Sequence, residues 1–224
     1  MKSLKKKYLF KNRWDYENGF YLTSGLDRLS KLLDHYDVFN QIKNIKGDIL
    51  EFGVFKGSSL VRFLSFMHLI NSNKRIHAFD VFGKFPKQVR DDDVNFIKKF
   101  EKASGDGISK EDLLFFLKKK FNDVSNLNLI KGDIVKTLPK FIKKNPNKKF
   151  SLINLDVDVY EPTKVILENI YNKLSPNGVI IFDDYNSVKG ETDAVDNFFK
   201  SRGIKLKLKK TKYTNLPKIY IKQP

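Results

Sequence analysis

Acidic residues close two apolar segments in the C-terminal half of the chain. Asp156 and Asp158 follow one segment, and Asp183 and Asp184 follow the other. Each segment has the length and composition of a buried strand. Carboxylates at the ends of two neighbouring strands can converge on one cation, and ligation by oxygen alone suits magnesium, calcium or manganese. We therefore predict that Asp156, Asp183 and Asp184 bind a metal ion.

A metal site of this kind can also activate a hydroxyl group. The adjacent carboxylates of Asp183 and Asp184 repel each other unless a positive charge lies nearby. A metal ion lowers the pKa of a bound hydroxyl, and Asp156 can then accept the proton. The three histidines lie outside both acidic segments, so we interpret them as structural. Tyr160 and Tyr185 flank the acidic segments and are candidates for lining a substrate pocket.

A glycine-containing segment lies between the first predicted strand and the helix after it. It contains Gly53 and Gly57 and carries Glu51 near the end of the strand. Glycine lets the backbone turn tightly and lets a ligand approach, and the free amides near Ser58 can bind a carboxylate or a phosphate. The spacing differs from the dinucleotide motif GxGxxG. An acid beside this turn suits a cofactor that carries both an amine and a carboxylate.

Two further acids end the second and third predicted strands. Asp80 holds a position at which an acid hydrogen-bonds ribose hydroxyls in nucleotide-binding sheets, although it lies somewhat further from the glycines than usual. Asp133 follows the third strand and can face the edge of an adenine ring. Both predictions put a nucleoside beside the glycine-containing segment.

The candidate residues lie on an alternating series of strands and helices. The apolar runs predict strands at 48–53, 75–80, 127–132, 150–156 and 179–183, with a looser hairpin of 205–209 and 219–221. Helical spacing predicts helices at 26–45, 58–70, 138–144, 162–174 and 191–201, and a charged helical stretch at 91–121 that is interrupted at 104–107. This alternation indicates an α/β fold with a parallel sheet and helices on both faces. Ligands bind such sheets at the carboxyl ends of the strands.

Length and composition narrow the class of protein. The 224 residues suffice for one α/β domain with a substantial core. Cysteine is absent, which excludes disulfides, thiolate zinc sites and cysteine nucleophiles. No uncharged apolar run approaches the length of a membrane span, and the basic N-terminus lacks the apolar core of a signal peptide. We therefore expect a cytoplasmic protein without a membrane partner.

The net charge of +17 raises the question of a nucleic-acid partner. Lysine supplies most of this charge, whereas specific base readout and bidentate phosphate contacts favour arginine. The chain also lacks an Asn-Pro-Pro-Tyr-type base-methylation motif. We interpret the charge as a solvated, lysine-rich surface that would still attract an anionic substrate.

Together, these motifs resemble the macrocin O-methyltransferase family, class I S-adenosylmethionine-dependent enzymes that methylate sugar hydroxyls. The resemblance covers residues 16–200, and the combination of Asp156 with Asp183 and Asp184 is its most specific part. The other matching segments are 20–29, 51–57, 78–82, 155–163 and 190–199. The chain departs from the family in the loop after Asp80, residues 81–86, where the family usually has a serine and a more acidic loop.

The resemblance implies a Rossmann-like class I methyltransferase fold with a seven-stranded mixed sheet. It implies a single domain over residues 1–224, with an N-terminal helical segment at 1–46 and a mobile lid within 83–121. S-adenosylmethionine would be bound by Glu51, Gly53, Phe55, Gly57, Ser58, Asp80 and Asp133. Magnesium would be bound by Asp156, Asp183 and Asp184, with Asp158 as a supporting residue.

We therefore expect a magnesium-dependent O-methyltransferase that acts on a sugar hydroxyl, with a nucleotide-linked deoxysugar as the favoured acceptor. An alternative acceptor is a catechol-like compound or another vicinal diol. An alternative of another class is a nucleic-acid-binding protein or an RNA methyltransferase. A nicotinamide-dependent oxidoreductase is disfavoured because GxGxxG and a substrate domain are missing. The sequence leaves open whether the protein forms a homo-oligomer.

Overall fold

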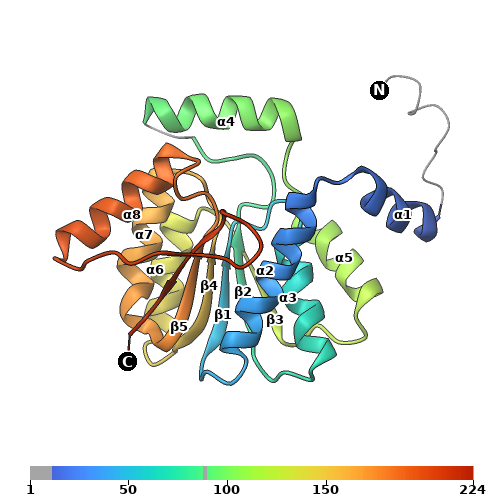
Figure 1. The fold of residues 1–224 in the computed structure, drawn as a ribbon, viewed down its shortest axis with the longest axis horizontal. Coiled ribbons are helices and arrows are strands. Elements are labelled where there is room, and N and C mark those ends of the chain that lie inside the picture. The colour runs from blue at the N-terminus through green and yellow to red at the C-terminus, as the bar shows by residue number, and fades with distance from the viewer. Residues whose placement is uncertain (1–11, 88–89, 224) are drawn as a thin grey trace.

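The computed structural model describes residues 12–87 and 90–223. Within these residues, seven strands form one mixed sheet in the order β3-β2-β1-β4-β5-β7-β6. The first five strands of this order are parallel, β7 is antiparallel to β5, and β6 is antiparallel to β7. The α/β fold and the seven-stranded mixed sheet predicted above are confirmed (Figure 1).

The elements follow the predicted order. The strands are β1 (Asp48–Phe52), β2 (Ile76–Asp80), β3 (Leu127–Lys131), β4 (Phe150–Leu155), β5 (Leu174–Phe182), β6 (Lys209–Lys210) and β7 (Lys218–Ile221). The helices are α1 (Arg13–Thr23), α2 (Leu26–Ile42), α3 (Ser58–Leu69), α4 (Asp91–Ser104), α5 (Lys110–Lys120), α6 (Ile134–Lys144), α7 (Tyr160–Ile170), the 3₁₀ turn η2 (Tyr171–Lys173) and α8 (Lys189–Ser201).

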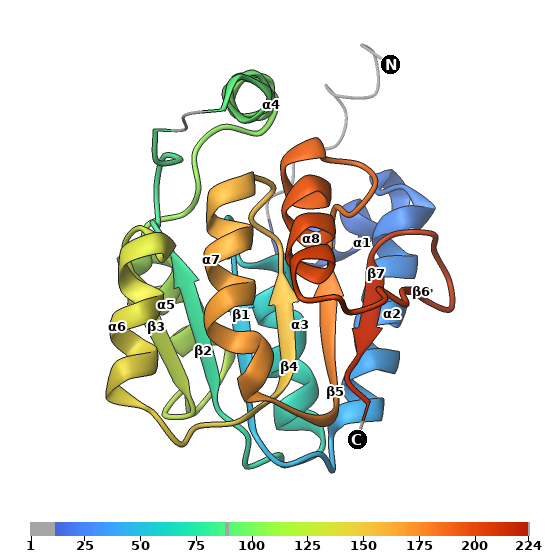
Figure 2. The ribbon, with the colours of Figure 1, turned by 90° about the vertical axis from the view of Figure 1, so that its left-hand side faces the viewer.

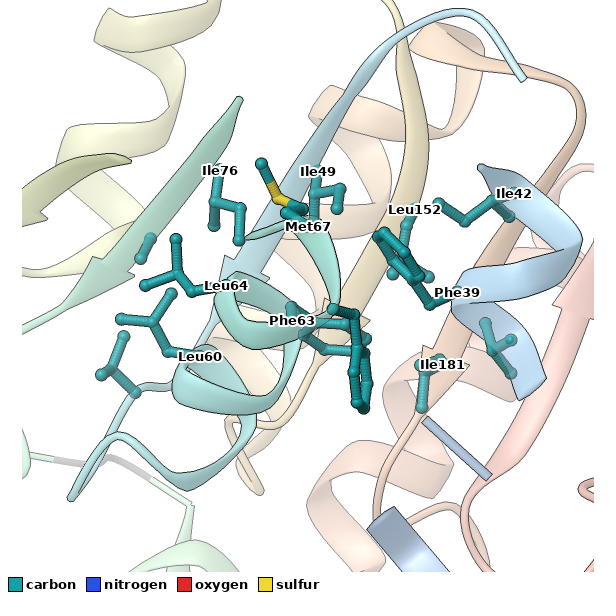
Figure 3. Packing of buried hydrophobic residues seen from close by; sticks show 14 of the residues in the cluster. Phe39, Ile42, Ile49, Leu60, Phe63, Leu64, Met67, Ile76, Leu152 and Ile181 are labelled. Carbon is teal, nitrogen blue, oxygen red and sulfur yellow. The ribbon is translucent and has the colours of Figure 1, made fainter. Parts of the chain in front are cut away.

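Two apolar cores lie on opposite faces of the sheet, because successive side chains of a strand point to opposite faces. In β1, Ile49 belongs to the core shared with α2 and α3, whereas Leu50 belongs to the core shared with α6, α7 and α8. Figure 2 shows the sheet between these two layers of helices. In the first core, Phe39 of α2 and Phe63 of α3 gather over Leu152 of β4, and all three are fully buried (Figure 3). Each such side chain contributes about 1.5–3 kcal/mol.

Two elements begin four or five residues earlier than predicted, for local reasons. Helix α6 begins at Ile134 because Asp133 caps it, its carboxylate accepting a hydrogen bond from the amide of Val135 at 3.0 Å. Strand β5 begins at Leu174 because this residue pairs with Phe150 of β4. The first difference is important for the site, because the capping residue Asp133 also lines the cavity described below.

The parallel strands all end at one edge of the sheet, which brings residues far apart in the sequence together. Helix α4 lies above this edge in both views (Figures 1 and 2). None of the helices in residues 12–87 and 90–223 is long and apolar enough to cross a lipid bilayer.

Candidate functional site

A cavity of about 690 Å³ opens at the carboxyl edge of the sheet, and residues of α4 form part of its wall. Eight of the predicted site residues line it: Gly53, Phe55, Ser58, Asp80, Asp133, Asp156, Asp183 and Asp184. Glu51, Gly57, Tyr160 and Tyr185 do not line it. The structure therefore brings the predicted nucleoside side and the predicted metal side into one space.

The backbone geometry at position 53, directly after β1, requires glycine. Its φ is +83°, and a Cβ atom at this position would lie 1.7 Å from the carbonyl oxygen of Asp156. The amide of Asp156 in turn donates to the carbonyl of Phe52 at 3.0 Å. The backbones after β1 and β4 thus touch directly, so the glycine-containing segment and Asp156 are positioned by the same contact.

Asp80 organises the glycine-containing segment from the neighbouring strand. One oxygen of its carboxylate accepts hydrogen bonds from the amides of Val54 and Phe55 at 2.7 and 3.0 Å, and the other accepts from Phe82 at 2.6 Å. A carboxylate offers about four acceptor sites, so Asp80 keeps capacity for a ligand in the cavity that it lines. Its role as a ribose ligand stays a prediction.

Glu51 lies directly under the site and is fully buried. The hydroxyl of Ser59 donates to one of its oxygens, and the other oxygen has no partner among the residues that the structure describes. Complete burial raises the pKa of Glu51 to about 8, because the hydrogen bond from Ser59 offsets only part of the desolvation cost. The side chain is therefore neutral through most of the physiological range in this arrangement.

The raised pKa of Glu51 predicts a pH-dependent cost to stability. Between pH 4.5 and about 8 the folded protein holds a proton that the unfolded chain has released, so stability falls as pH rises. We expect Glu51→Gln to remove this slope of about 1 kcal/mol per pH unit. Urea unfolding of the cation-free protein at pH 5, 6.5 and 8 measures it. The exposed Glu168→Gln is the matched control, and equal slopes in both variants would refute the assignment.

An acidic cluster occupies the other side of the cavity. One carboxylate oxygen each of Asp156, Asp158 and Asp184 lies within 4.8 Å of the others. Burial and then the charge of Asp183 raise the pKa of Asp156 well above its usual range, and burial and then Asp184 do the same for Asp158. The predicted trio places Asp183 in this set, whereas the structure groups Asp158 with the other two. The backbone of Asp158 has a φ of +63°.

Asp183 has a cationic partner that the sequence did not reveal. The ammonium of Lys31, on α2, donates to Asp183 at 2.5 Å. Burial lowers the pKa of Lys31, but the charges of Asp183, Asp156 and Asp184 outweigh it and the net pKa is raised. The other oxygen of Asp183 has no partner among the described residues. No local pattern could predict this pair, because helix packing alone brings Lys31 to the end of β5.

A fifth acid supports the cluster from below. Glu191, in the first turn of α8, is fully buried and accepts a hydrogen bond from the amide of Asp184 at 3.2 Å. Burial, followed by the charges of Asp184 and Asp183, raises its pKa well above the usual range. So many carboxyl groups in a small volume need protons or a cation, and oxygen ligands alone fit a hard divalent ion.

The two tyrosines lie outside the cavity and make other contacts. The hydroxyl of Tyr185 donates to Asp196 at 2.8 Å. The guanidinium carbon of Arg90 lies 4.4 Å from the centroid of the Tyr160 ring. The backbone amide of Tyr160 donates a hydrogen bond to Asp93 of α4 at 3.1 Å. These contacts tie the start of α4 to the start of α7. Their role in substrate binding stays a prediction.

Helix α4 supplies part of the cavity wall that the sequence analysis did not assign. Phe96 and Phe100 line the cavity from this helix, together with Phe85 from the segment before it. The rings of Phe85 and Phe100 meet edge to face at 5.7 Å. Arg90 also pairs with Asp193 of α8 at 2.6 Å. An aromatic roof therefore lies opposite the polar strand ends.

Comparison with known proteins adds a family. A family model described as macrocin O-methyltransferase (TylF) matches residues 12–216. A curated relative is the 8-demethyl-8-(2,3-dimethoxy-alpha-L-rhamnosyl)-tetracenomycin-C 4'-O-methyltransferase of Streptomyces olivaceus. It is 29% identical over 190 residues, which are 80% of this chain and 68% of that relative.

Two solved structures show the same fold. The O-methyltransferase NovP has a TM-score of 0.76 at 20% sequence identity, over 87% of this chain and 80% of that chain. CalS11, described as a TDP-rhamnose 3'-O-methyltransferase, has a TM-score of 0.66 at 23% identity, over 94% and 86% of the two chains. The predicted class I methyltransferase fold is confirmed by these likenesses.

Proposed function

We propose that this chain, which belongs to the macrocin O-methyltransferase family and is an S-adenosylmethionine-dependent O-methyltransferase, methylates a sugar hydroxyl of a nucleotide-linked deoxysugar. The observation that carries the proposal is the single cavity lined by Gly53 and Asp80 on one side and by Asp156 and Asp184 on the other. Donor and acceptor would thus meet at the ends of β1 and β4. We further propose that the reaction takes place in the cytoplasm.

The relatives support a sugar as the acceptor. The matched tetracenomycin enzyme is described as acting on a rhamnosyl group, and CalS11 is described as acting on TDP-rhamnose. These descriptions include both a sugar already attached to a natural product and a sugar attached to a nucleotide. We favour the nucleotide-linked form because the protein is strongly basic, which attracts a phosphorylated substrate.

The donor is bound by the glycine-containing segment and its neighbours. Gly53 allows close approach, and the amides at the start of α3, beside Ser58, accommodate the methionine carboxylate. Asp80 accepts from the ribose hydroxyls, and Asp133 lies near the adenine.

The acidic cluster fits a divalent cation, because its donors are carboxylate oxygens that repel one another without a positive charge. Asp156, Asp158 and Asp184, whose carboxylate oxygens lie within 4.8 Å of one another, would hold magnesium, with Asp183 and its partner Lys31 beside them. When bound, the metal would supply Lewis-acid stabilisation of the developing alkoxide. Lys31 already supplies one positive charge to Asp183, which reduces the repulsion in the cluster.

The protein's own groups complete the reaction. The sugar oxygen attacks the methyl carbon in line, the C–O bond forms as the C–S bond breaks, and the hydroxyl proton passes to Asp156. The products are the methyl ether and S-adenosylhomocysteine. The phenylalanines of α4 exclude water from the reacting groups, and we propose α4 as the lid that opens for exchange of substrates. Alignment of donor and acceptor supplies much of the rate.

A methyl-transfer assay with labelled S-adenosylmethionine tests the proposal. We expect turnover of nucleotide-linked deoxysugars that falls by about a hundredfold or more with chelator and returns with magnesium, since a metal supplies several kcal/mol of charge stabilisation. Catechols, free glycosides and RNA serve as alternative acceptors in parallel reactions. Turnover of catechol or RNA alone would refute the proposed sugar acceptor. Activity that is unchanged by chelator would refute the proposed metal dependence.

A further inference from the structure

Two arginines form one wall of the cavity beside the acidic cluster. Arg28 lies in the first turn of α2, and Arg62 lies one turn after Ser58 in α3. Both line the cavity, as does Lys31. Helices α2 and α3 pack against each other, which brings the two guanidinium groups to the same wall from separate elements.

Neither guanidinium has a strong partner among the residues that the structure describes. Arg62 is half-buried and makes no hydrogen bond or close ion pair with any residue in 12–87 or 90–223. Arg28 pairs with the adjacent Asp27 at 3.3 Å, but their side chains are 60% and 70% exposed, so this pair contributes little. Burial lowers the pKa of Arg62, and the charge of Arg28 lowers it further, while Asp183 and Glu51 act in the opposite direction from a distance.

The arrangement has unused donors and an unbalanced charge. Two guanidinium groups on one wall repel each other unless an anion lies between them. Guanidinium groups bind phosphate and carboxylate oxygens through paired hydrogen bonds. We propose that Arg28 and Arg62 form an oxyanion subsite that binds the phosphate groups of the acceptor. This inference rests on the proposed function, because a nucleotide-linked sugar is the acceptor that brings phosphate into the cavity.

The methyl donor carries an oxyanion too, its methionine carboxylate. The start of α3 beside Ser58 offers free amides for that group. The arginine wall adjoins the acceptor side instead, because Lys31, one turn after Arg28 on α2, holds Asp183 at 2.5 Å. The acceptor's phosphates are therefore the expected source of the oxyanion.

Calorimetric titration separates the two sources without any need for turnover. Thymidine diphosphate probes the phosphates, and S-adenosylhomocysteine probes the donor carboxylate. We expect Arg62→Gln and Arg28→Gln each to lower the affinity for thymidine diphosphate about ten- to a hundredfold, because charge-assisted contacts are lost. The affinity for S-adenosylhomocysteine should change less than twofold. Arg62→Lys keeps the positive charge but cannot form the paired hydrogen bonds of a guanidinium group. Its affinity for thymidine diphosphate should therefore lie between those of Arg62→Gln and wild type.

Arg75→Gln is the matched control, because Arg75 is exposed and precedes β2 at the opposite edge of the sheet. It should change neither affinity, and melting temperatures verify that every variant is folded. If the two substitutions lower the affinity for S-adenosylhomocysteine but not for thymidine diphosphate, the subsite binds the donor carboxylate, and its assignment to the acceptor is wrong. Decarboxylated S-adenosylmethionine would then be insensitive to both substitutions.

Unchanged affinity for both ligands in folded Arg28→Gln and Arg62→Gln overturns the subsite. The same holds if wild-type protein does not bind thymidine diphosphate and the donor affinity is unaltered. Failure of the proposed function gives a different pattern, namely phosphate binding that depends on the arginines without methylation of any nucleotide sugar.

Discussion

Asp156→Asn is expected to abolish most methyl transfer while leaving the donor bound and the protein folded. The substitution replaces the carboxylate that would take the proton of the sugar hydroxyl with an amide. General-base catalysis contributes about 10²–10⁴-fold in rate. Because burial and Asp183 already raise the pKa of Asp156, a neutral amide at this position relieves repulsion. We therefore expect a melting temperature equal to or above that of wild type, together with a kcat lower by at least about a hundredfold.

Asp196→Asn is the matched control, because it makes the same chemical change outside the cavity, where Asp196 accepts from Tyr185. It should keep nearly full activity. Affinity for S-adenosylhomocysteine, measured by titration, distinguishes a lost base from a lost donor site. Activity of Asp156→Asn within a few-fold of wild type would show that another group takes the proton.

Gly53→Ala is expected to damage both halves of the site through one contact. A Cβ atom would stand 1.7 Å from the carbonyl oxygen of Asp156, so the end of β1 must move away from the end of β4. The residue also has a φ of +83°, which costs a non-glycine residue about 1–2 kcal/mol. The clash adds about 1–3 kcal/mol, as in other overpacked positions. Donor affinity should fall together with stability, because the moved segment carries the donor contacts.

Gly203→Ala isolates the backbone part of that cost. Gly203 has a φ of +64°, and nothing lies within 4 Å of its Cβ position. Urea unfolding should therefore show a loss of about 1–2 kcal/mol for Gly203→Ala and a distinctly larger loss for Gly53→Ala. Equal losses in the two variants, with donor affinity intact in both, would show that the close contact after β1 and β4 is not required for stability or donor binding.

The sequence by itself determined the order of elements and the edge where the chemistry lies. Apolar runs and helical spacing are local properties, and they are retained because each strand and helix must bury its apolar side. Parallel strands share one carboxyl edge, so acids such as Asp80 and Asp156 were predictable as neighbours before their contacts were known. The glycine at position 53 was likewise predictable as a turn, although not its contact with Asp156.

Only the tertiary structure decided which groups touch. Lys31 meets Asp183 across 152 positions of sequence, and Arg28 reaches the same wall as Arg62, because packing in the core sets the rotation of α2 over the sheet. Asp158, whose backbone has a φ of +63°, lies among the close carboxylates in place of Asp183. Rotations and turns of this kind depend on the shapes of many distant side chains at once, and a local pattern carries no information about them.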